Sequence, residues 1–370
     1  MAAAFPVRMA LFCGCLAFPA FSQTGFAQQD LSPSQVPPPA ERSSNTEPGV
    51  DRRISLDVFV SDKSGKPVSG LQQEDFTVLD DHRPQKILSF RATGQTSETA
   101  DSPLQAILLV DSVNNGFQGA GQQRQQLDKF LRQNGGQLPI PISLVLLTDT
   151  STHLQPMPTR DGKTLADSLD SNQTGLRPIG NSQGFYGGMD RFQISLRALE
   201  ALISYEVTQP GRKLLVWLSP GWPLFWGPGV QLTAKDQEFL FSTVVELSAE
   251  LREARITLYS IDATGVADAG SFRTFYYQNF LKGVTSVGKV QNGNLGLQVL
   301  ATQSGGRVLT SSNDIAKAIA TCLADTNAFY TVSFDSVPAD HPNEYHNLQI
   351  KIDKPGLTAR TRTGYYAQNK

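Results

Sequence analysis

The stretch LQAILLVD at residues 104–111 decides the fold that we expect for this chain. It is a run of apolar residues that ends at Asp111, and similar runs follow at residues 142–147, 213–218 and 256–261. Apolar runs without alternation are typical of strands buried on both faces of a parallel sheet. Segments with helical periodicity lie between these runs, and alternating strands and helices indicate a doubly wound open sheet. We therefore expect an α/β domain over residues 104–335, with a Rossmann-like, mostly parallel sheet.

The segments between the strands carry helix signals. Leu240, Val244, Leu247 and Leu251 recur at helical spacing. Thr233, with Asp236 three residues later, resembles a capping box in front of this helix. A further helix is expected at residues 295–304, closed by two glycines.

A small β unit is expected outside the α/β domain. The apolar residues at positions 54, 56, 58 and 60 alternate with others, which predicts a half-buried strand. Short strands are expected at 53–91 and again at 346–366, and each segment alone offers too few strands for a stable sheet. Chain ends are often close in space, so we expect the two segments to form one unit.

The N-terminal residues have the character of an export signal. Residues 1–27 contain a single charge, Arg8, followed by an apolar run and small residues at 25 and 27. This arrangement predicts a secretory signal peptide cleaved near Ala27, the alternative being a buried N-terminal helix. Residues 28–52 are rich in Gln, Ser and Pro and are expected to form a flexible linker. We expect a secreted or periplasmic protein without a transmembrane segment after signal removal.

Composition restricts the functions to consider. The 370 residues are 39% hydrophobic and 18% charged, which suits a globular protein, and the formal net charge is −2. A nucleic-acid binder would show a basic excess, so we expect no nucleic-acid partner. Of the three cysteines, only Cys322 remains after signal removal. Its helical spacing with Ile315 and Ile319 indicates a buried core thiol rather than a catalytic one.

Four motifs in order resemble a known family. They are LDVFV leading to LQQEDF (56–60 and 71–76), LLVD (108–111), LATQSGGR (300–307) and GYY (364–366). Together they resemble the secreted von Willebrand factor A-related proteins of the acidobacterial type, over roughly residues 53–367. The resemblance implies a Rossmann-like fold that binds partners at the carboxyl edge of its sheet. In the wider family, a magnesium ion held in three loops often bridges to an acidic group on the partner.

The residues that the resemblance places at the metal site depart from the family pattern. Asp111 matches the first ligand, but Val113 and Asn115 stand where the family has serines. Met189 occupies the threonine position and Pro220 the later aspartate position. Magnesium needs near-octahedral oxygen ligands. We therefore expect a degenerate site consisting of Asp111, Asn115 and the neighbouring Asp190, and no resident cofactor, with magnesium the metal that this loop could still hold.

Enzyme chemistry finds little support in the sequence. Residues 180–184 match G-x-S-x-G around Ser182, but the strand and helix that a nucleophile elbow needs are not predicted there. The four histidines show no zinc-ligand spacing, and no nucleotide-binding loop occurs. We expect a binding protein and no enzyme. The alternatives are an envelope hydrolase with an unrecognised site and a structural subunit of a surface assembly.

An aromatic loop follows one of the predicted core strands. Trp222, Phe225 and Trp226 lie among Pro and Gly residues directly after the run at 213–218. Aromatic side chains at the carboxyl edge of a sheet could form a rim that binds a protein partner. Equally, they could fold down over the sheet edge as a lid.

Overall fold

The structure is a computed structural model that describes residues 53–93, 104–115, 117–155, 157–171, 184–223, 232–262, 276–310 and 314–367. Every described residue belongs to one compact unit, Gly49–Lys370. The predicted signal peptide (1–27) and linker (28–52) lie outside the described residues. Among the described helices, none is both long enough and apolar enough to cross a membrane.

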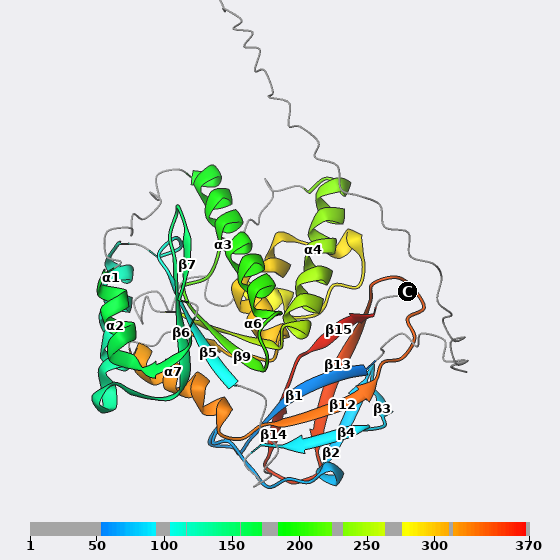
Figure 1. Cartoon of the computed structure of the whole chain (residues 1–370). Helices are drawn as coiled ribbons and strands as arrows, with labels where there is room; N and C mark the ends of the chain where they lie inside the picture. Colours follow the sequence, from blue (N-terminus) through cyan, green and yellow to red (C-terminus); the bar gives the residue numbers. More distant parts are fainter. Residues whose placement is uncertain are drawn as a thin grey trace, which may run out of the picture. The chain divides into compact units, whose positions relative to one another are not determined.

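The central sheet is mostly parallel and confirms the predicted fold class (Figure 1). Its order is β11-β10-β9-β5-β6-β7, with β8 also paired to β6. Neighbours among β5, β6, β9, β10 and β11 run parallel, whereas β7 and β8 run antiparallel to β6. The strands are β5 (Leu104–Asp111), β6 (Gln137–Leu147), β7 (Thr152–Leu154), β8 (Thr159–Asp161), β9 (Arg212–Leu218), β10 (Ile256–Ile261) and β11 (Val308–Leu309).

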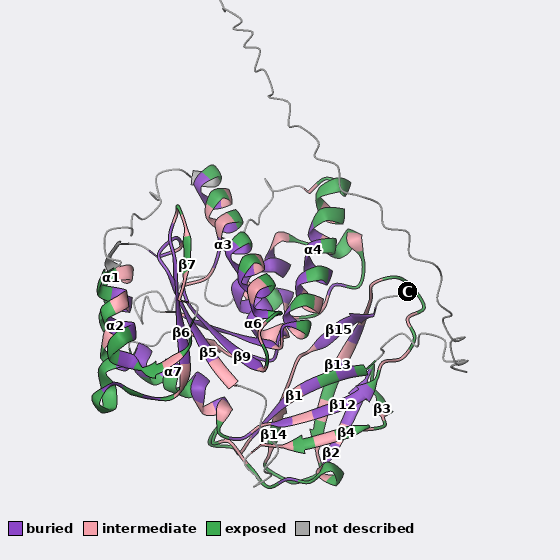
Figure 2. Ribbon diagram, in the orientation of Figure 1, coloured by how far each residue is buried: buried purple, intermediate pink, exposed green. Residues whose placement is uncertain are grey.

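Helices cover both faces of this sheet, as a doubly wound fold requires. One face packs against α1 (Phe117–Arg132), α2 (Gly162–Ser171) and α7 (Ile315–Leu323). The other packs against α3 (Gly184–Glu206), α4 (Ala234–Glu253) and α6 (Leu297–Gln303). Every residue of β9 and β10 is buried (Figure 2). Apolar strands without alternation are stable here because burying each large apolar side chain contributes about 1.5–3 kcal/mol.

Local signals read from the sequence hold in the structure. The N–H of Asp236 donates to the Thr233 hydroxyl (3.2 Å), and the N–H of Thr233 donates back to the Asp236 carboxylate (2.9 Å), which confirms the capping box before α4. Cys322 lies fully buried on α7, where desolvation by burial raises the pKa of its thiol. This confirms a core cysteine. Short 3-10 turns lie at Gln73–Asp75, Gln133–Gly136, Tyr277–Phe280, Val287–Lys289, Asn292–Leu295 and Ala324–Thr326.

The N- and C-terminal strands form two antiparallel sheets around a core of their own. The first has the order β14-β1-β12-β4 and the second β15-β13-β2-β3. The pairings of β1 with β14 and of β2 with β13 bring strands from residues 53–91 beside strands from residues 346–366, and β12 joins β1 as well. The strands are β1 (Arg53–Ser61), β2 (Phe76–Asp80), β3 (Arg83–Gln85), β4 (Ser89–Ala92), β12 (Tyr330–Asp335), β13 (Glu344–Ile352), β14 (Thr358–Arg360) and β15 (Gly364–Ala367).

Strand β12 lies within the range 104–335 expected for the α/β domain, yet it pairs with β1 and β4. Its alternating pattern explains this, because Tyr330, Val332 and Phe334 face the core between the two antiparallel sheets. A strand with one polar face does not suit the doubly buried interior of a parallel sheet. The domain boundaries themselves stay a prediction.

A buried ionic network ties the antiparallel sheets to the α/β part. The carboxylate of Asp325 accepts hydrogen bonds from Tyr259 of β10 (2.9 Å), from Arg307 (3.1 Å) and from Arg360 of β14. Asp325 is only 2% exposed, so these bonds form away from competing water. The two parts therefore meet through specific charge-assisted bonds between β10 and β14.

Candidate functional site

The carboxyl ends of β5 and β9 form the natural binding position of this fold. From β5 the chain first moves outward to β6 and then returns to β9 on the other side of β5. Ligands of open α/β sheets bind at the point where the strand order reverses. The predicted residue Asp111 ends β5 at this point, and Ser219 directly follows β9. The structure thus places the first predicted site residue at the switch point of the sheet.

The Asp111 carboxylate is fully engaged in hydrogen bonds within the protein. Its Oδ1 accepts from the backbone N–H groups of Val113 (2.9 Å) and Asn114 (2.9 Å). Its Oδ2 accepts from the Asn114 side-chain amide (2.8 Å) and from the indole N–H of Trp217 (2.9 Å). Asp111 is completely buried. Both oxygens therefore have two donors each, and the carboxylate holds the loop against the middle of the sheet.

Asn115 also has a bridging position. Its amide nitrogen donates to the carbonyl of Asp111 (2.7 Å) and to Oε1 of Gln123, which in turn donates to the carbonyl of Leu218 (2.9 Å). This chain of bonds links the end of β5 to the end of β9 through α1. The Oδ1 atom of Asn115 is buried and has no hydrogen-bond partner among the described residues.

Asp190 lies apart from the bonds around Asp111. It is exposed near the start of α3, and no hydrogen bond to Asp111 or Asn115 is seen among the described residues. The link from the Asp111 loop to α3 is made instead by Asn114, whose amide donates to the hydroxyl of Ser195 (2.8 Å). The structure therefore brings Asp111 and Asn115 together through bonds, and Asp190 does not take part in them.

Trp222 is buried beneath the surface instead of forming a rim. Only 4% of it is exposed, and its ring makes edge contacts with Trp217 (5.1 Å between centroids) and Phe192 (6.3 Å). For Trp222, this position agrees with the alternative in which the aromatic loop folds down over the sheet edge. The other two predicted contact residues, Phe225 and Trp226, lie outside the described residues, as does Ser182 of the G-x-S-x-G match.

Two exposed aromatic side chains were missed by the sequence reasoning. Tyr186, in the first turn of α3, is 79% exposed, and Phe239, in the second turn of α4, is 65% exposed. The helices α3 and α4 are followed directly by the parallel strands β9 and β10, which start at the amino edge of the sheet, so both helices begin on the opposite side. Both residues therefore lie on the carboxyl side of the sheet, where Figure 2 shows exposed residues at the starts of α3 and α4. A signal existed for Phe239, which falls outside the apolar stripe of its helix.

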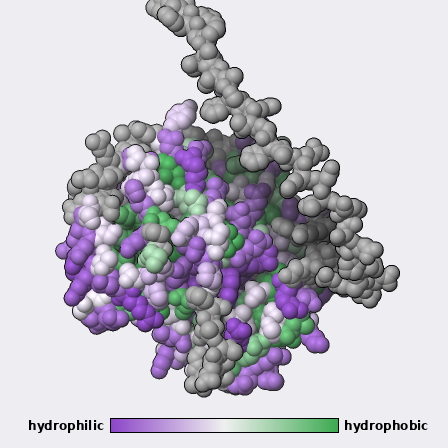
Figure 3. Space-filling model, viewed as in Figure 1, coloured by the Kyte–Doolittle hydropathy of each residue, from purple (hydrophilic) through white to green (hydrophobic). Residues whose placement is uncertain are grey.

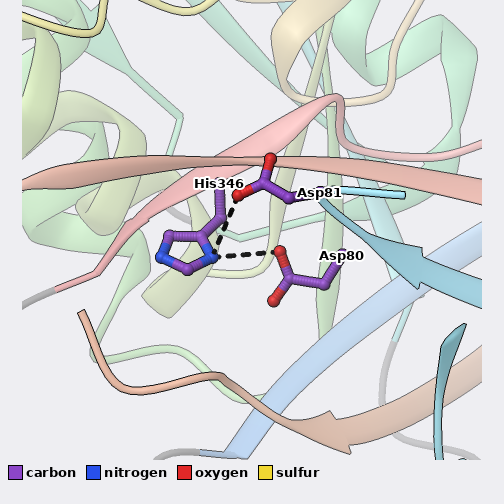
Figure 4. A group of neighbouring side chains, drawn as sticks. All are labelled: Asp80, Asp81 and His346. Atoms are coloured by element: carbon purple, nitrogen blue, oxygen red, sulfur yellow. Dashed lines mark hydrogen bonds and ion pairs between the residues drawn. The ribbon is translucent and has the colours of Figure 1, made fainter. Parts of the chain in front are cut away.

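A second cluster of polar side chains lies in the antiparallel sheets (Figure 4). Nδ1 of His346 on β13 lies 3.0 Å from Oδ1 of Asp80 and 3.6 Å from Oδ2 of Asp81. The hydroxyl of Tyr365 donates to the other oxygen of Asp80 (2.7 Å), and its ring stacks on the imidazole at 4.9 Å. Burial, followed by the bond to Asp80, raises the pKa of Tyr365. The sequence concealed this cluster, because Asp80 and His346 are 266 residues apart.

The cluster joins β2, β13 and β15. Its histidine and carboxylate ligand atoms lie within 4.8 Å of one another, a donor set that suits a transition metal. However, both oxygens of Asp80 already have hydrogen-bond partners, and the imidazole nitrogen without one, Nε2, faces away from the two carboxylates (Figure 4). The bonds seen here fasten the turn after β2 to the C-terminal strands, which is a structural role.

Comparison with known proteins gives matches in structure alone. No protein-family model matches the chain, and no curated protein sequence does. Solved structures that it resembles include a mutant of the PilB minor pilin from Streptococcus sanguinis, at 13% identity and a TM-score of 0.32, covering 73% of this chain and 80% of that one. The VWA domain of SpRpn10 matches at 14% identity and a TM-score of 0.26, over 59% of this chain and 93% of that domain. Manganese-loaded TRAP protein from Plasmodium vivax matches at 8% identity and a TM-score of 0.32, over 75% and 99% of the two chains.

Proposed function

We propose that this chain is a secreted von Willebrand A-like interaction module that binds a protein partner at the carboxyl edge of its central sheet. The proposal assigns the contact to the surface around the starts of α3 and α4. It assigns no metal ion and no catalytic step to the site.

The exposure of Tyr186 and Phe239 carries the proposal. Aromatic residues are enriched in the centres of protein interfaces, where they supply much of the binding energy. These two large aromatic side chains are 79% and 65% exposed, and a protein partner would cover this surface. Burying one such ring contributes about 1.5–3 kcal/mol. On the face drawn in Figure 3, hydrophilic residues predominate and hydrophobic residues form separate groups.

The residues at the degenerate metal site do not fit a magnesium ion. Magnesium demands about six oxygen ligands in near-octahedral geometry. Both Asp111 oxygens already accept two N–H donors each, and a cation would have to displace them. Val113, Met189 and Pro220 carry no side-chain oxygen. This supports a contact made by side chains of the surrounding loops and helices without a bridging ion.

Export is the second element of the proposal. Residues 1–27 carry the single Arg, the apolar run and the small residues of a secretory signal. Sequencing the N-terminus of the protein recovered from the producing cells tests this, and a mature protein that retains Met1 contradicts it.

Affinity capture tests the binding site. The tagged chain is compared with the double variant Tyr186→Ser, Phe239→Ser and with the control Val207→Ser, which removes a 49% exposed apolar residue just beyond the other end of α3. We expect a partner that is retained equally with magnesium and with a chelator, lost with the double variant and kept with the control. Retention that depends on magnesium, or equal retention by the double variant, contradicts the proposal.

A further inference from the structure

A cleft lined with arginines lies on the opposite side of the α/β part from the carboxyl edge. It has a volume of about 440 Å³ and lies between the first antiparallel sheet and the residues around the end of α4 and the start of β10. Its lining includes five arginines from the described residues: Arg53, Arg91, Arg252, Arg255 and Arg362. We call it the arginine cleft. Pockets of about 300–1,000 Å³ are typical of small-molecule sites.

The floor of the arginine cleft is the polar face of strands β1, β12 and β4. In β1, Ile54, Leu56 and Val58 face the core, so the alternate residues Arg53, Ser55 and Asp57 face outward. The strand register then aligns two rows across the floor. These are Asp57, Thr331 and Arg91 in one row, and Ser55, Ser333 and Ser89 in the other, of which Ser333 is buried and does not line the cleft. The Thr331 hydroxyl bonds to Asp57 (3.3 Å) and the Ser89 and Ser333 hydroxyls bond to each other, so guanidinium groups are the main donors that the floor offers.

The wall of the cleft comes from the α/β part and from the chain after β14. Arg252 lies in the last turn of α4, Arg255 precedes β10, and Arg362 precedes β15. Arg362 donates to the carbonyl of Ser248 in α4 (3.2 Å). Guanidinium groups therefore face the cleft from elements that are remote in the sequence, on the floor and on the wall alike.

The positive charge of the cleft exceeds the negative charge available to balance it. Asp57 and Glu253 are its only acidic lining residues within the described chain. Asp57 is already used, since its carboxylate lies 3.1 Å from Nε of the buried Arg212 and 3.9 Å from Arg255. Glu253 lies 3.8 Å from Arg252, and its side chain is 60% exposed, so solvent screens the pair. Arg53 is paired as well, with Asp335 outside the lining (3.9 Å). The five arginines of the lining therefore face three carboxylates, and the cleft keeps an excess of positive charge.

The C-terminus of α4 does not supply enough negative charge to balance the arginines. A helix C-terminus carries about half a negative charge, which partly offsets the nearest arginines. Burial, and then the neighbouring charge of Arg252, lowers the pKa of Arg362 to about 10, which still leaves it protonated near neutral pH. Arg252 and Arg362 therefore repel each other in this partly enclosed space. An anion bound between them would relieve this repulsion.

An adjoining smaller pocket supplies an independent observation. Arg212 is 1% exposed and lines this pocket together with Arg91 and Arg255. Its Nε lies 3.1 Å from a carboxylate oxygen of Asp57, but Nη1 and Nη2 have no hydrogen-bond partner among the described residues, and the guanidinium group lies over the rings of Phe59 and Phe329. Buried donors without acceptors are rare in folded proteins. An oxygen-rich anion bound beside these guanidinium donors would supply the acceptors that they lack.

We propose that the arginine cleft binds a multiply charged oxyanion, carrying phosphate or carboxylate groups on a small molecule or glycan. The planar guanidinium group pairs with both of these groups through two parallel hydrogen bonds. The cleft is larger than a single phosphate needs, so the ligand carries at least two charged groups or an organic portion. This site is separate from the carboxyl edge and does not depend on the function proposed for that edge.

Calorimetry on the full chain tests the inference, with pyrophosphate and citrate as probes at low ionic strength. Saturable binding of one probe molecule per chain is expected. Binding of pyrophosphate alone indicates a phosphate ligand, and binding of citrate alone indicates a carboxylate ligand. Binding of both probes indicates that the cleft recognises the oxyanion chemistry that they share. Arg91→Gln on the floor and Arg252→Gln on the wall should each weaken binding about ten-fold or more, since each removes charge-assisted hydrogen bonds. Arg91 lies exposed on an edge strand, so its variant should fold normally.

The matched control is Arg197→Gln, which removes one exposed positive charge from α3, away from the cleft. Its affinity for the probes should equal that of the unmodified chain. The inference is overturned when neither probe binds, or when Arg197→Gln weakens binding as much as the two cleft variants. The second outcome would mean that the probes respond only to net charge.

Discussion

Replacing Asp111 by Asn tests whether this carboxylate is a structural acceptor or a metal ligand. The amide keeps one oxygen and replaces the other by an NH2 group, which donates instead of accepting. In either orientation the NH2 group faces two N–H donors. These are the backbone N–H groups of Val113 and Asn114 on one side, or the Asn114 amide and the Trp217 indole on the other.

The expected destabilisation follows from this count. Each buried donor left without an acceptor costs about 1–3 kcal/mol. Two such donors cost about 2–6 kcal/mol, and the lower half of that range applies because Asn114 is only half-buried and water can reach it. A domain is stable by about 5–15 kcal/mol. Asp111→Asn should therefore remove a large fraction of the free energy of unfolding while the chain still folds.

Urea unfolding with and without magnesium chloride measures this effect. We expect the same loss of about 2–4 kcal/mol in both conditions, and no effect of magnesium on the unmodified chain. Asp149→Asn, two residues beyond the end of β6, is the control and should change stability by about 0.5 kcal/mol or less. A ligand at one hundred times its Kd stabilises a protein by about 2.7 kcal/mol. Magnesium stabilisation of the unmodified chain that disappears in Asp111→Asn would refute the structural interpretation.

Two further predictions concern packing and charge. Gly306→Ala should lower the free energy of unfolding by about 3 kcal/mol or more, because an added Cβ would lie 1.7 Å from the carbonyl oxygen of Leu258. Thermal unfolding checks this. The control is Gly121→Ala in α1, where nothing lies within 4 Å of the added Cβ and a neutral or stabilising effect is expected. Burial, and then the charge of Glu246, raises the pKa of Glu200 above its ordinary value of 4.5. The folded state therefore favours the protonated carboxyl, and the stability of the protein falls as the pH rises from 4.5 through the pKa of the folded state. Glu246→Gln should make this fall smaller and raise stability at pH 7 by a few tenths of a kcal/mol, with no gain at pH 4; a gain of equal size at both pH values would contradict the assignment.

The sequence alone determined the features that depend on local patterns. Apolar runs without alternation predicted the buried strands β5, β6, β9 and β10, because a strand covered on both faces needs apolar side chains throughout. The alternation in β1 predicted a half-buried strand, and Thr233 with Asp236 predicted the start of α4. The sequence also located Asp111 at the end of its strand. Such signals lie within a few residues of one another, so no tertiary information is needed to read them.

The tertiary structure alone decided which side chains meet across long separations. Asp111 receives the indole N–H of Trp217, 106 residues away, and this bond occupies an oxygen that the family pattern would offer to a metal. Burial of Trp222 and exposure of Tyr186 and Phe239 depend on how α3 and α4 cover the sheet edge. The arginine cleft needs the register of β1, β12 and β4 beside the end of α4. Periodicity reports which face of an element is buried, but partners across the fold depend on register and on how the elements dock, which no short window of sequence contains.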